Sequence, residues 1–360
     1  MDFEPIQRLE ATPVDVVGDV HGQREALERL LGLLGYDARG RHPDGRRLLF
    51  VGDLCDRGPD SPGVFERVMP LVEAGVATCL LGNHELPLID PDERARHKSG
   101  NAWFFGGEEA CARDEAAHGP FARATAAQRA RIAAFCDRLP LAAEHPAVRA
   151  VHACWDPASL EFIRGTEARS NRELLAASRA RAAAHLARAG LTERYPAARL
   201  ALEERRRLRE WAPDHGVTVE EQLLIDDLVP GEHLEQREDP VKVLTAGPER
   251  PADVPRWLGG KWRFLARVPW WQEQPPDRPT VFGHYWRHRR HRPLEPYDEH
   301  AALFGAAGPA DGLGPGGRAL CIDYCWPGEW RRPTLAALRP DLGGLVFCDG
   351  ERLPAPVAPG

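Results

Sequence analysis

The stretch that decides the fold is Val14–Gly22, which reads VDVVGDVHG. Its first half is short, rich in Val and bounded by Gly, which predicts a buried β-strand. Asp19 and His21 follow directly, so two potential metal ligands stand at the carboxyl end of this strand. That end is where ligands bind in open α/β sheets. One such motif is weak evidence, because a lone Gly-Asp is usually a turn.

The same arrangement recurs at four more predicted strands. Leu48–Gly52, Ala77–Gly82, Val148–Ala153 and Thr280–His284 are short apolar runs, and they lead into or end in Asp53, Asn83-His84-Glu85, His152 and His284. The adjoining glycines allow sharp turns that bring such side chains together. Five occurrences in this order are hard to assign to chance, so we interpret them as one site.

Helical patterns alternate with the first strands. Leu27, Leu30, Leu31 and Leu34 form one apolar face of a predicted helix, and Val64–Ala74 predicts another. Ser170–Trp211 is rich in Ala, Arg, Leu and Glu, which favours helix. Further apolar runs at Ala319–Tyr324 and Gly344–Asp349 predict strands again. We therefore expect an α/β sandwich formed by residues 1–156 and 271–360, with a mostly helical insertion, 157–270, that caps or flanks it.

Composition sets limits on location and partners. The chain has 360 residues, 43% of them hydrophobic, and a net charge of -7. This charge argues against binding to long nucleic acid, which normally needs a basic surface. No apolar run reaches the length of a membrane span, and the N-terminus lacks a secretory pattern, so a cytoplasmic protein with no membrane partner is expected. The 8 cysteines are scattered, and Cys79, Cys321 and Cys348 are expected to be buried reduced thiols.

The residue types at the strand ends indicate metal chemistry. Carboxylates, imidazoles and an amide, without thiolates, suit Mn, Fe, Zn or a similar divalent ion. A carboxylate can bridge two ions about 3.5–4 Å apart, the separation used by two-metal hydrolases. Such a pair makes hydroxide available near neutral pH and stabilises a phosphoryl group in the transition state.

With these motifs the sequence resembles the calcineurin-like metallophosphoesterases, in the branch of Ser/Thr phosphoprotein phosphatases and symmetrical diadenosine-tetraphosphate hydrolases. The family signature is G-D-x-H-G, G-D-x-x-D-R-G, G-N-H-E and two separated histidines. All five blocks stand here in order between Gly18 and His284. The resemblance covers about 14–155 and 275–350 well and the insertion poorly. It implies a β-sandwich flanked by helices, with two divalent metal ions, Mn first and Fe, Zn or Ni as alternatives.

The resemblance also implies roles for individual residues. Asp19 and His21 would hold the first metal, Asp53 would bridge, and the second metal would be held by Asn83, His152 and His284. His84 matches the proton donor to the leaving group. Asp56 would orient His84, and Arg57 matches a phosphate-clamping arginine.

Some positions depart from the pattern or allow two interpretations. The family often has Asp-Thr-Gly-Cys after a late strand, whereas this chain has Asp323-Tyr324-Cys325-Trp326, without the glycine. A second phosphate-binding arginine is not aligned, and Arg267 is the candidate, with a surface residue whose stem packs on Trp270 or Trp271 as the alternative. Glu85 is expected to be structural, either packing or hydrogen-bonding beneath the site.

Aromatic and basic residues near His284 have two interpretations each. The aromatic residues could stack on a substrate base, but we expect them to pack in the core. They are Trp257, Trp262, Trp270 and Trp271. The basic residues His288 and His291 could form a basic rim that attracts anions, or they could belong to an exposed loop.

The sequence therefore predicts a hydrolase that cleaves a phosphomonoester by attack of metal-bound hydroxide. Its substrate would be a phosphoprotein, a nucleotide or a small phosphorylated molecule. Symmetrical hydrolysis of diadenosine tetraphosphate is the nearest alternative, and an RNA-end or nucleotide phosphatase that reads its substrate through the insertion is another. A non-catalytic metal-binding scaffold is the alternative of another class, although His84, Asp56 and Arg57 serve chemistry rather than metal retention.

Overall fold

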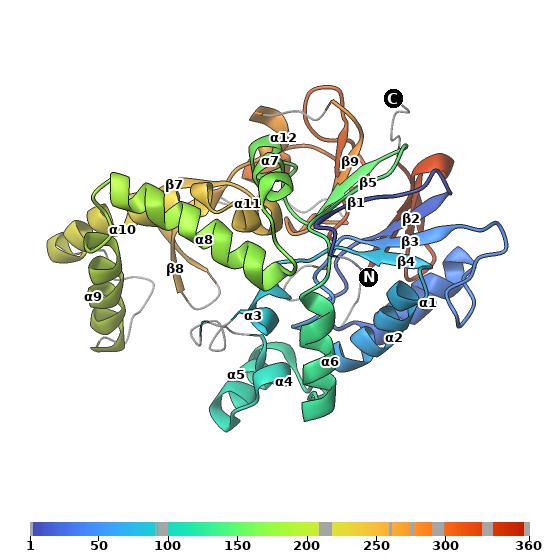
Figure 1. Cartoon of the computed structure of the whole chain (residues 1–360), viewed down its shortest axis with the longest axis horizontal. Coiled ribbons are helices and arrows are strands. Elements are labelled where there is room, and N and C mark those ends of the chain that lie inside the picture. The colour runs from blue at the N-terminus through green and yellow to red at the C-terminus, as the bar shows by residue number, and fades with distance from the viewer. Residues whose placement is uncertain are drawn as a thin grey trace.

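The computed structural model describes residues 3–90, 92, 100–208, 218–258, 261–273, 277–289, 299–325 and 334–355. Within these residues two β-sheets pack face to face, and helices flank them (Figure 1). The predicted α/β sandwich is therefore confirmed.

The first sheet has six strands in the order β13-β12-β11-β2-β3-β4. Their bounds are β2 (Val14–Val17), β3 (Arg47–Phe50), β4 (Ala77–Cys79), β11 (Ala336–Arg339), β12 (Gly344–Phe347) and β13 (Arg352–Pro354). Strands β2, β3 and β4 run parallel, so their carboxyl ends lie at one edge of the sheet. Three of the five motifs follow these three strands, which places them at that edge.

The second sheet has five strands in the order β1-β5-β6-β9-β10. Their bounds are β1 (Ile6–Arg8), β5 (Ala142–Glu144), β6 (Arg149–Val151), β9 (Thr280–Phe282) and β10 (Ala319–Cys321). Strands β6, β9 and β10 are parallel, and the two late histidine motifs follow β6 and β9. The site is therefore assembled from both layers of the sandwich.

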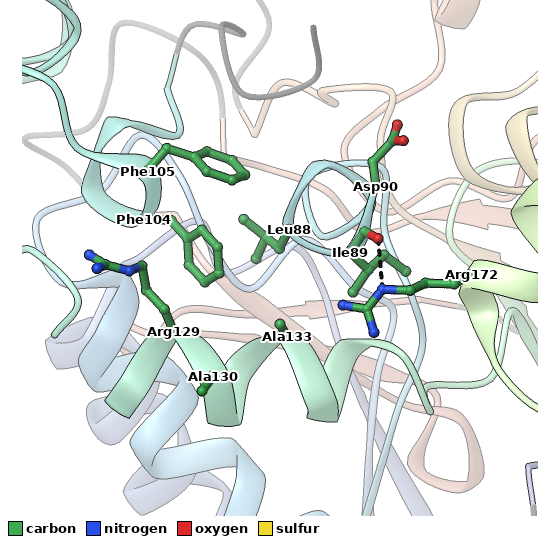
Figure 2. Close-up of a pocket in the computed structure, with 9 residues that line it drawn as sticks. All are labelled: Leu88, Ile89, Asp90, Phe104, Phe105, Arg129, Ala130, Ala133 and Arg172. Atoms are coloured by element: carbon green, nitrogen blue, oxygen red, sulfur yellow. Dashed lines mark hydrogen bonds between the residues drawn. The ribbon is translucent and has the colours of Figure 1, made fainter. Parts of the chain in front are cut away.

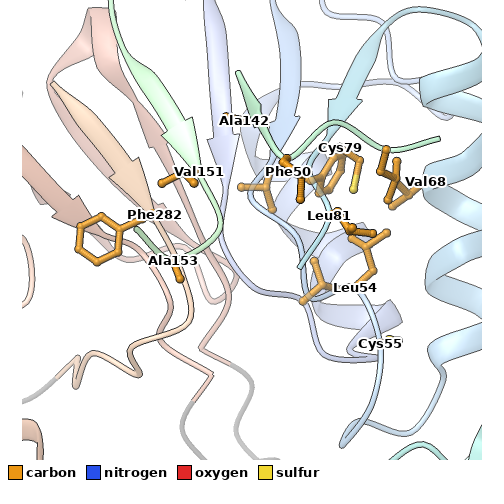
Figure 3. Packing of buried hydrophobic residues seen from close by; sticks show 14 of the residues in the cluster. Phe50, Leu54, Cys55, Val68, Cys79, Leu81, Ala142, Val151, Ala153 and Phe282 are labelled. Carbon is orange, nitrogen blue, oxygen red and sulfur yellow. The ribbon is translucent and has the colours of Figure 1, made fainter. Parts of the chain in front are cut away.

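Both faces of the first sheet are buried, which explains its near-continuous apolar sequence. Val16 and Leu49 pack toward Val281 of the second sheet in one hydrophobic cluster. Phe50 lies in another cluster with Val68 of the helical layer (Figure 3). Each fully buried Leu or Phe stabilises the fold by about 1.5–3 kcal/mol, so this double packing gives the motif loops a rigid support.

Six helices lie between the first strands and β5: α1 (Arg24–Leu34), α2 (Ser61–Glu73), α3 (Leu86–Ile89), α4 (Ala102–Phe105), α5 (Glu108–His118) and α6 (Ala126–Cys136). The predicted apolar face of α1 is buried, and the helix ends at Gly35, whose φ is 97°. Helix α2 begins at Ser61 rather than at the predicted Val64. The reason is local, because Asp60 accepts a hydrogen bond from the Gly63 amide and caps the helix.

The region predicted as an insertion contains helices and one hairpin. Its elements are α7 (Pro157–Gly165), α8 (Asn171–Arg188), α9 (Arg194–Leu208), α10 (Val219–Glu238), α11 (Pro240–Ala246), β7 (Glu249–Leu258) and β8 (Lys261–Arg267). The chain returns to the sandwich through α12 (Trp270–Glu273), and later come α13 (Glu299–Phe304) and a 3-10 turn (Pro340–Leu342). The β7–β8 hairpin was not predicted. Pro251 and Pro255 stand in β7, and an irregular register follows Pro251, which an isolated two-stranded sheet tolerates.

Helix α8 forms hydrogen bonds with residues 89 and 90, which follow the third motif. Arg172 Nε donates to the carbonyl of Ile89 at 3.0 Å, and Arg179 Nη1 donates to Asp90 at 2.8 Å. A pocket of about 470 Å³ adjoins this contact and lies between α3, α4 and α6 (Figure 2). Helix α8 thus contacts the end of α3, the helix that begins directly after Glu85. Within the part of the chain that the structure describes, no helix has the length and apolarity to cross a bilayer.

Candidate metal centre

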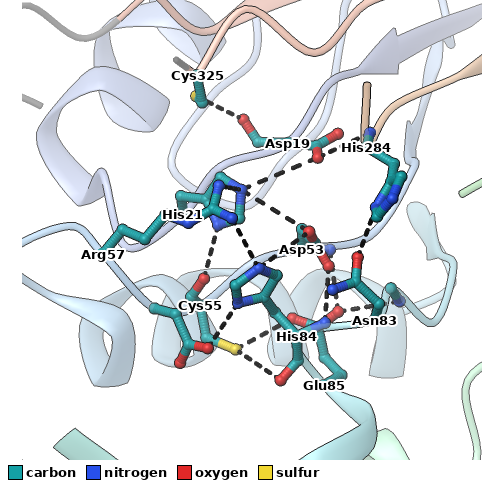
Figure 4. A network of polar contacts seen from close by, with 12 residues as sticks. Asp19, His21, Asp53, Cys55, Arg57, Asn83, His84, Glu85, His284 and Cys325 are labelled. Carbon is teal, nitrogen blue, oxygen red and sulfur yellow. Dashed lines mark hydrogen bonds and ion pairs between the residues drawn. The ribbon is translucent and has the colours of Figure 1, made fainter. Parts of the chain in front are cut away.

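The structure brings all six predicted metal ligands together in one cluster, five of them buried and Asn83 partly buried. Figure 4 labels five of them, Asp19, His21, Asp53, Asn83 and His284. Asp19 and His21 follow β2, Asp53 follows β3, and Asn83 follows β4. His152 and His284 come from the second sheet, after β6 and β9. Two overlapping groups of possible ligand atoms result, one with His21, Asp53 and His84, the other with Asp53, His152 and His284.

Asp53 belongs to both groups because its two carboxylate oxygens face different histidines. Oδ2 lies 3.7 Å from His21 Nε2, whereas Oδ1 lies 3.3 Å from His152 Nε2. The amide of His84 donates to Oδ1 at 3.0 Å. This geometry suits a carboxylate that bridges two cations, because each oxygen is directed toward a separate group.

The histidine nitrogens and the amide oxygen around Asn83 are arranged in a way that suits a bound cation. His152 Nδ1 is 2.8 Å from the Val51 carbonyl, so a neutral ring carries its proton there and leaves a lone pair on Nε2. That Nε2 lies 3.1 Å from Asn83 Oδ1, and His284 Nδ1 lies 2.8 Å from the same oxygen. A positive charge placed among these atoms would satisfy them together.

Electrostatics point the same way. Burial alone would lower the pKa of His152, yet Asp53 raises it to about 10, so this position stabilises positive charge. Burial, followed by the guanidinium of Arg57, lowers the pKa of His21 well below its usual value. Burial and Arg267 do the same for His284. The rings of His21 and His284 are therefore neutral near pH 7, the form that binds metal.

Asp19 also fits a metal ligand. It is buried, and Oδ1 has no hydrogen-bond partner among the residues that the structure describes, while Oδ2 accepts from the His284 amide at 3.1 Å. Burial and the nearby Asp323 raise the pKa of Asp19 well above its usual value. Gly283 permits this arrangement, since a Cβ there would stand 1.9 Å from Asp19 Oδ1. The residues present thus fit divalent metal binding by their charge, donor type and orphaned oxygen.

The predicted proton donor and its partner are in contact. His84 Nδ1 lies 2.6 Å from Asp56 Oδ2, which leaves Nε2 directed at the cluster, 3.8 Å from Asp53. Arg57 approaches both rings, with Nη1 2.8 Å from His21 Nε2 and Nη2 3.0 Å from His84 Nε2. The three residues therefore face the same space as the metal-ligand atoms.

The structure also places Arg267 beside the cluster. This residue ends β8, and its Nη1 donates to the carbonyl of His284 at 3.2 Å. Its guanidinium lies 4.5 Å from the ring centre of Trp286, and that of Arg57 lies 5.0 Å from the same ring. Two arginines that are distant in sequence thus share one tryptophan near the cluster.

Backbone strain is concentrated here. Among the described residues, the non-glycine residues with positive φ are His21, Asp53, Asp56, Arg57, His284 and Trp286. Positive φ is unfavourable for such side chains and persists where the surroundings enforce it, commonly at functional sites. Five of these six residues were predicted site residues. Trp286 has positive φ as well but was not predicted.

Glu85 supports the cluster from beneath, as predicted. It is fully buried and accepts hydrogen bonds from the amides of Asp53 at 2.9 Å, Leu54 at 2.8 Å and Gly82 at 3.0 Å. Burial and the charge of Asp53 raise the pKa of Glu85 to about 7. This side chain fixes the turn that presents Asp53.

Three residues of the site were missed by the sequence reasoning: Trp103, Asp323 and Trp286. Trp103 Nε1 donates to Asp56 Oδ1. Asp323 is buried, and its carboxylate accepts from the amides of Trp286 and Cys325. For Asp323 a usable signal was present, because this aspartate follows the buried strand β10 as the residues of the other motifs follow theirs. No sequence pattern pointed to Trp103 or Trp286.

The other aromatic and basic predictions have mixed outcomes. Trp270 and Trp271 are buried and pack on Phe282, which confirms core packing for these two. The side chains of Trp257 and Trp262, and all of His291 and Trp326, lie outside the described residues. His288 is half-buried, and its place in a basic rim stays a prediction. All eight cysteines are buried free thiols, which confirms the expectation for Cys79, Cys321 and Cys348.

Comparison with known proteins agrees with the motifs. Residues 12–145 match the family model of the calcineurin-like phosphoesterases. A stretch of 74 residues is 46% identical to the asymmetrical bis(5'-nucleosyl)-tetraphosphatase PrpE of Oceanobacillus iheyensis, and it covers 20% of this chain and 30% of that protein. The symmetrical bis(5'-nucleosyl)-tetraphosphatase of Ralstonia nicotianae is 42% identical over 77 residues, which cover 21% of this chain and 24% of the relative. The chain thus spans less than a third of these curated relatives.

Solved structures are similar at lower identity. A cold-active protein-tyrosine phosphatase of a psychrophilic Shewanella is 14% identical, with a TM-score of 0.47, over 99% of this chain and 83% of that one. The family model covers the residues that supply Asp19, His21, Asp53 and Asn83 to the cluster. Residues 12–145 of the chain therefore match the calcineurin-like phosphoesterase family, with these four residues inside the matched stretch.

Proposed function

We propose that this protein is a phosphoester hydrolase that uses two divalent metal ions, with Mn as the first candidate. The observation that carries the proposal is the double orientation of Asp53, whose oxygens face His21 on one side and His152 on the other. Asp19 and His21 would hold one ion, and Asn83, His152 and His284 the other. Bound ions would lower the pKa of a water molecule, so that hydroxide is available near neutral pH, and would neutralise charge on the phosphoryl oxygens.

The protein's own groups would then bind the substrate and manage the proton. Arg57 presents a planar, permanently charged fork that matches two phosphoryl oxygens. Arg267 supplies a second guanidinium on the side of His284. His84 is held by Asp56 with Nε2 toward the cluster, so it can donate a proton to the leaving oxygen. A pure scaffold would have no need for this donor and its buried partner.

The first substrate class is a phosphomonoester: a phosphoprotein, a nucleotide or a small phosphorylated molecule. A dinucleoside tetraphosphate is the second candidate, and it is favoured by the names of the curated relatives. The two classes differ in their products. Symmetrical cleavage of diadenosine tetraphosphate yields two ADP, whereas asymmetrical cleavage yields ATP and AMP.

The test is product release under added Mn from wild type and Asp53→Asn. The panel contains p-nitrophenyl phosphate, a phosphopeptide, nucleotides and diadenosine tetraphosphate, with products separated by chromatography and bound metal measured by mass spectrometry. Asp277→Asn is the matched control, because Asp277 is exposed and pairs with Arg149. We expect turnover and metal in wild type and Asp277→Asn, and a large loss of both in Asp53→Asn. Full metal content and activity in Asp53→Asn would refute the bridging role, and a metal-loaded wild type without turnover would favour the scaffold.

A further inference from the structure

Trp286 lies close to both arginines of the site, although nothing in the surrounding sequence marks it. The guanidinium carbons of Arg57 and Arg267 are 5.0 Å and 4.5 Å from the centre of its ring. Both distances are within the range of a cation–π interaction, for which tryptophan is the best aromatic partner. One indole thus interacts with a guanidinium from the loop after β3 and with another from the end of β8.

The indole is itself held in place by the backbone. Trp286 has a φ of 52°, an uncommon conformation for a bulky side chain. Its amide donates to Asp323 Oδ2 at 3.1 Å, and the next amide, that of Arg287, donates to the Asp323 carbonyl at 2.6 Å. The Arg287 side chain is buried and donates to the carbonyls of Gly308 and Asp311. The strained conformation is therefore fixed from both sides.

The indole adds a shared contact to the separate hydrogen bonds of Arg57 with His21 and His84 and of Arg267 with the His284 carbonyl. Two guanidinium groups repel each other, and arginine loses rotamer entropy when it is held in one place. A π face attracts both cations and does not compete for their N–H groups. Trp286 is only partly buried, unlike Trp270 and Trp271, so a role in core packing alone does not account for its position.

We propose that Trp286 is a positioning residue that holds Arg57 and Arg267 in the orientation that binds the phosphoryl group. This inference rests on the proposed function, since it assigns both arginines to phosphate binding. It makes the affinity for phosphate depend on a residue that need not touch phosphate. It also couples the β7–β8 hairpin, which carries Arg267, to the metal cluster through one side chain.

The experiment measures binding of inorganic phosphate to Mn-loaded protein by calorimetry, with kcat and KM for p-nitrophenyl phosphate beside it. The variants are Trp286→Leu, which removes the π face, and Trp286→Phe, which keeps a smaller one. Phe162→Leu is the matched control, because Phe162 lies under Arg181 at 5.5 Å in the α7–α8 region. We expect Trp286→Leu to weaken phosphate binding about tenfold and to raise KM more than it lowers kcat, with metal content unchanged. Trp286→Phe should stay within about threefold of wild type, and Phe162→Leu should match it.

A double-mutant cycle with Arg267→Ala separates positioning from direct contact. If Trp286 acts through the arginines, Trp286→Leu will have a clearly smaller effect once Arg267 is already gone. Unchanged phosphate affinity in Trp286→Leu, or strictly additive effects in the cycle, would overturn the inference. If Trp286→Leu does not fold, the cycle of Trp286→Met with Arg267→Ala decides by the same criterion, because Met also lacks the π face. A wild type that binds phosphate but hydrolyses nothing would refute the proposed function while leaving this cycle readable.

Discussion

His84 Nδ1 lies 2.6 Å from Asp56 Oδ2, and the second oxygen of the same carboxylate accepts a hydrogen bond from the indole of Trp103. Asp56 is buried, and its amide is 2.9 Å from the Ser61 hydroxyl. A carboxylate held on several sides fixes the orientation of the imidazole. This relationship directs His84 Nε2 at the cluster.

Asp56→Asn should therefore slow reactions that need the proton most. We expect kcat to fall about 10²-fold for a phenyl phosphate with a poor leaving group, since general acid catalysis is typically worth 10²–10⁴-fold. The loss should be much smaller for p-nitrophenyl phosphate, whose leaving group needs little protonation. The measurement is the dependence of log kcat on leaving-group pKa in wild type and variant. Equal losses for all leaving groups would contradict the assignment of His84 as general acid.

Trp103→Phe tests the outer layer of the same arrangement. The substitution keeps the stacking on Phe65 but removes the N–H that reaches Asp56. We expect kcat for the poor leaving group to fall about 5-fold, in line with the loss of one hydrogen bond to a charged group, while KM stays unchanged. Trp271→Phe is the control, because Trp271 is a fully buried tryptophan that packs on Phe282. A similar drop in both variants would mean that only packing is being measured.

Gly283→Ala should disable the metal cluster with a single methyl group. A Cβ at this position would stand 1.9 Å from Asp19 Oδ1, so Asp19 must move. We expect reduced Mn content and reduced activity. Gly32→Ala is the control, since Gly32 lies within α1 and has open space at its Cβ. That variant should keep its metal and gain about 0.5–1 kcal/mol of stability. Normal metal content in Gly283→Ala would show that Asp19 is not a required ligand.

A pH-dependent contribution to stability is expected from Asp341, far from the site in sequence. The hydrogen bond from Arg46 holds the pKa of Asp341 below its usual value of 3.8, against a smaller effect of burial. A carboxylate whose pKa is lower in the folded than in the unfolded state stabilises the fold at any pH above its unfolded pKa. This contribution is lost as the pH falls through the folded pKa. Asp341→Asn should therefore lower the free energy of unfolding by up to about 1 kcal/mol at pH 7. The difference should shrink at pH 3, as measured by urea unfolding.

Asp253→Asn serves as the comparison for Asp341→Asn. Asp253 is strongly exposed and pairs with Arg250 three residues away, so its replacement should change stability little at either pH. A constant difference between wild type and Asp341→Asn across the whole pH range would contradict the assignment.

The sequence was informative wherever a side chain follows a strand. Asp19, Asp53 and His152 could be placed because apolar strands and glycines mark the chain positions where functional groups emerge. It could not show that β6 and β9 belong to a different sheet from β2, because strand order depends on long-range pairing. The contact between Arg267 and Trp286 was hidden for a similar reason, since it arises from a hairpin that crosses back to the sandwich. Trp103 could not be recognised either, because its function lies in one N–H directed at Asp56.

The division of the cluster between two sheets has a consequence for unfolding. Asp19, Asp53 and Asn83 follow strands of one layer, whereas His152 and His284 follow strands of the other. Bound ions would then link the two sheets, which are otherwise held together by apolar packing. Metal loading should merge the melting of the two halves into one cooperative transition, and chelation should broaden that transition.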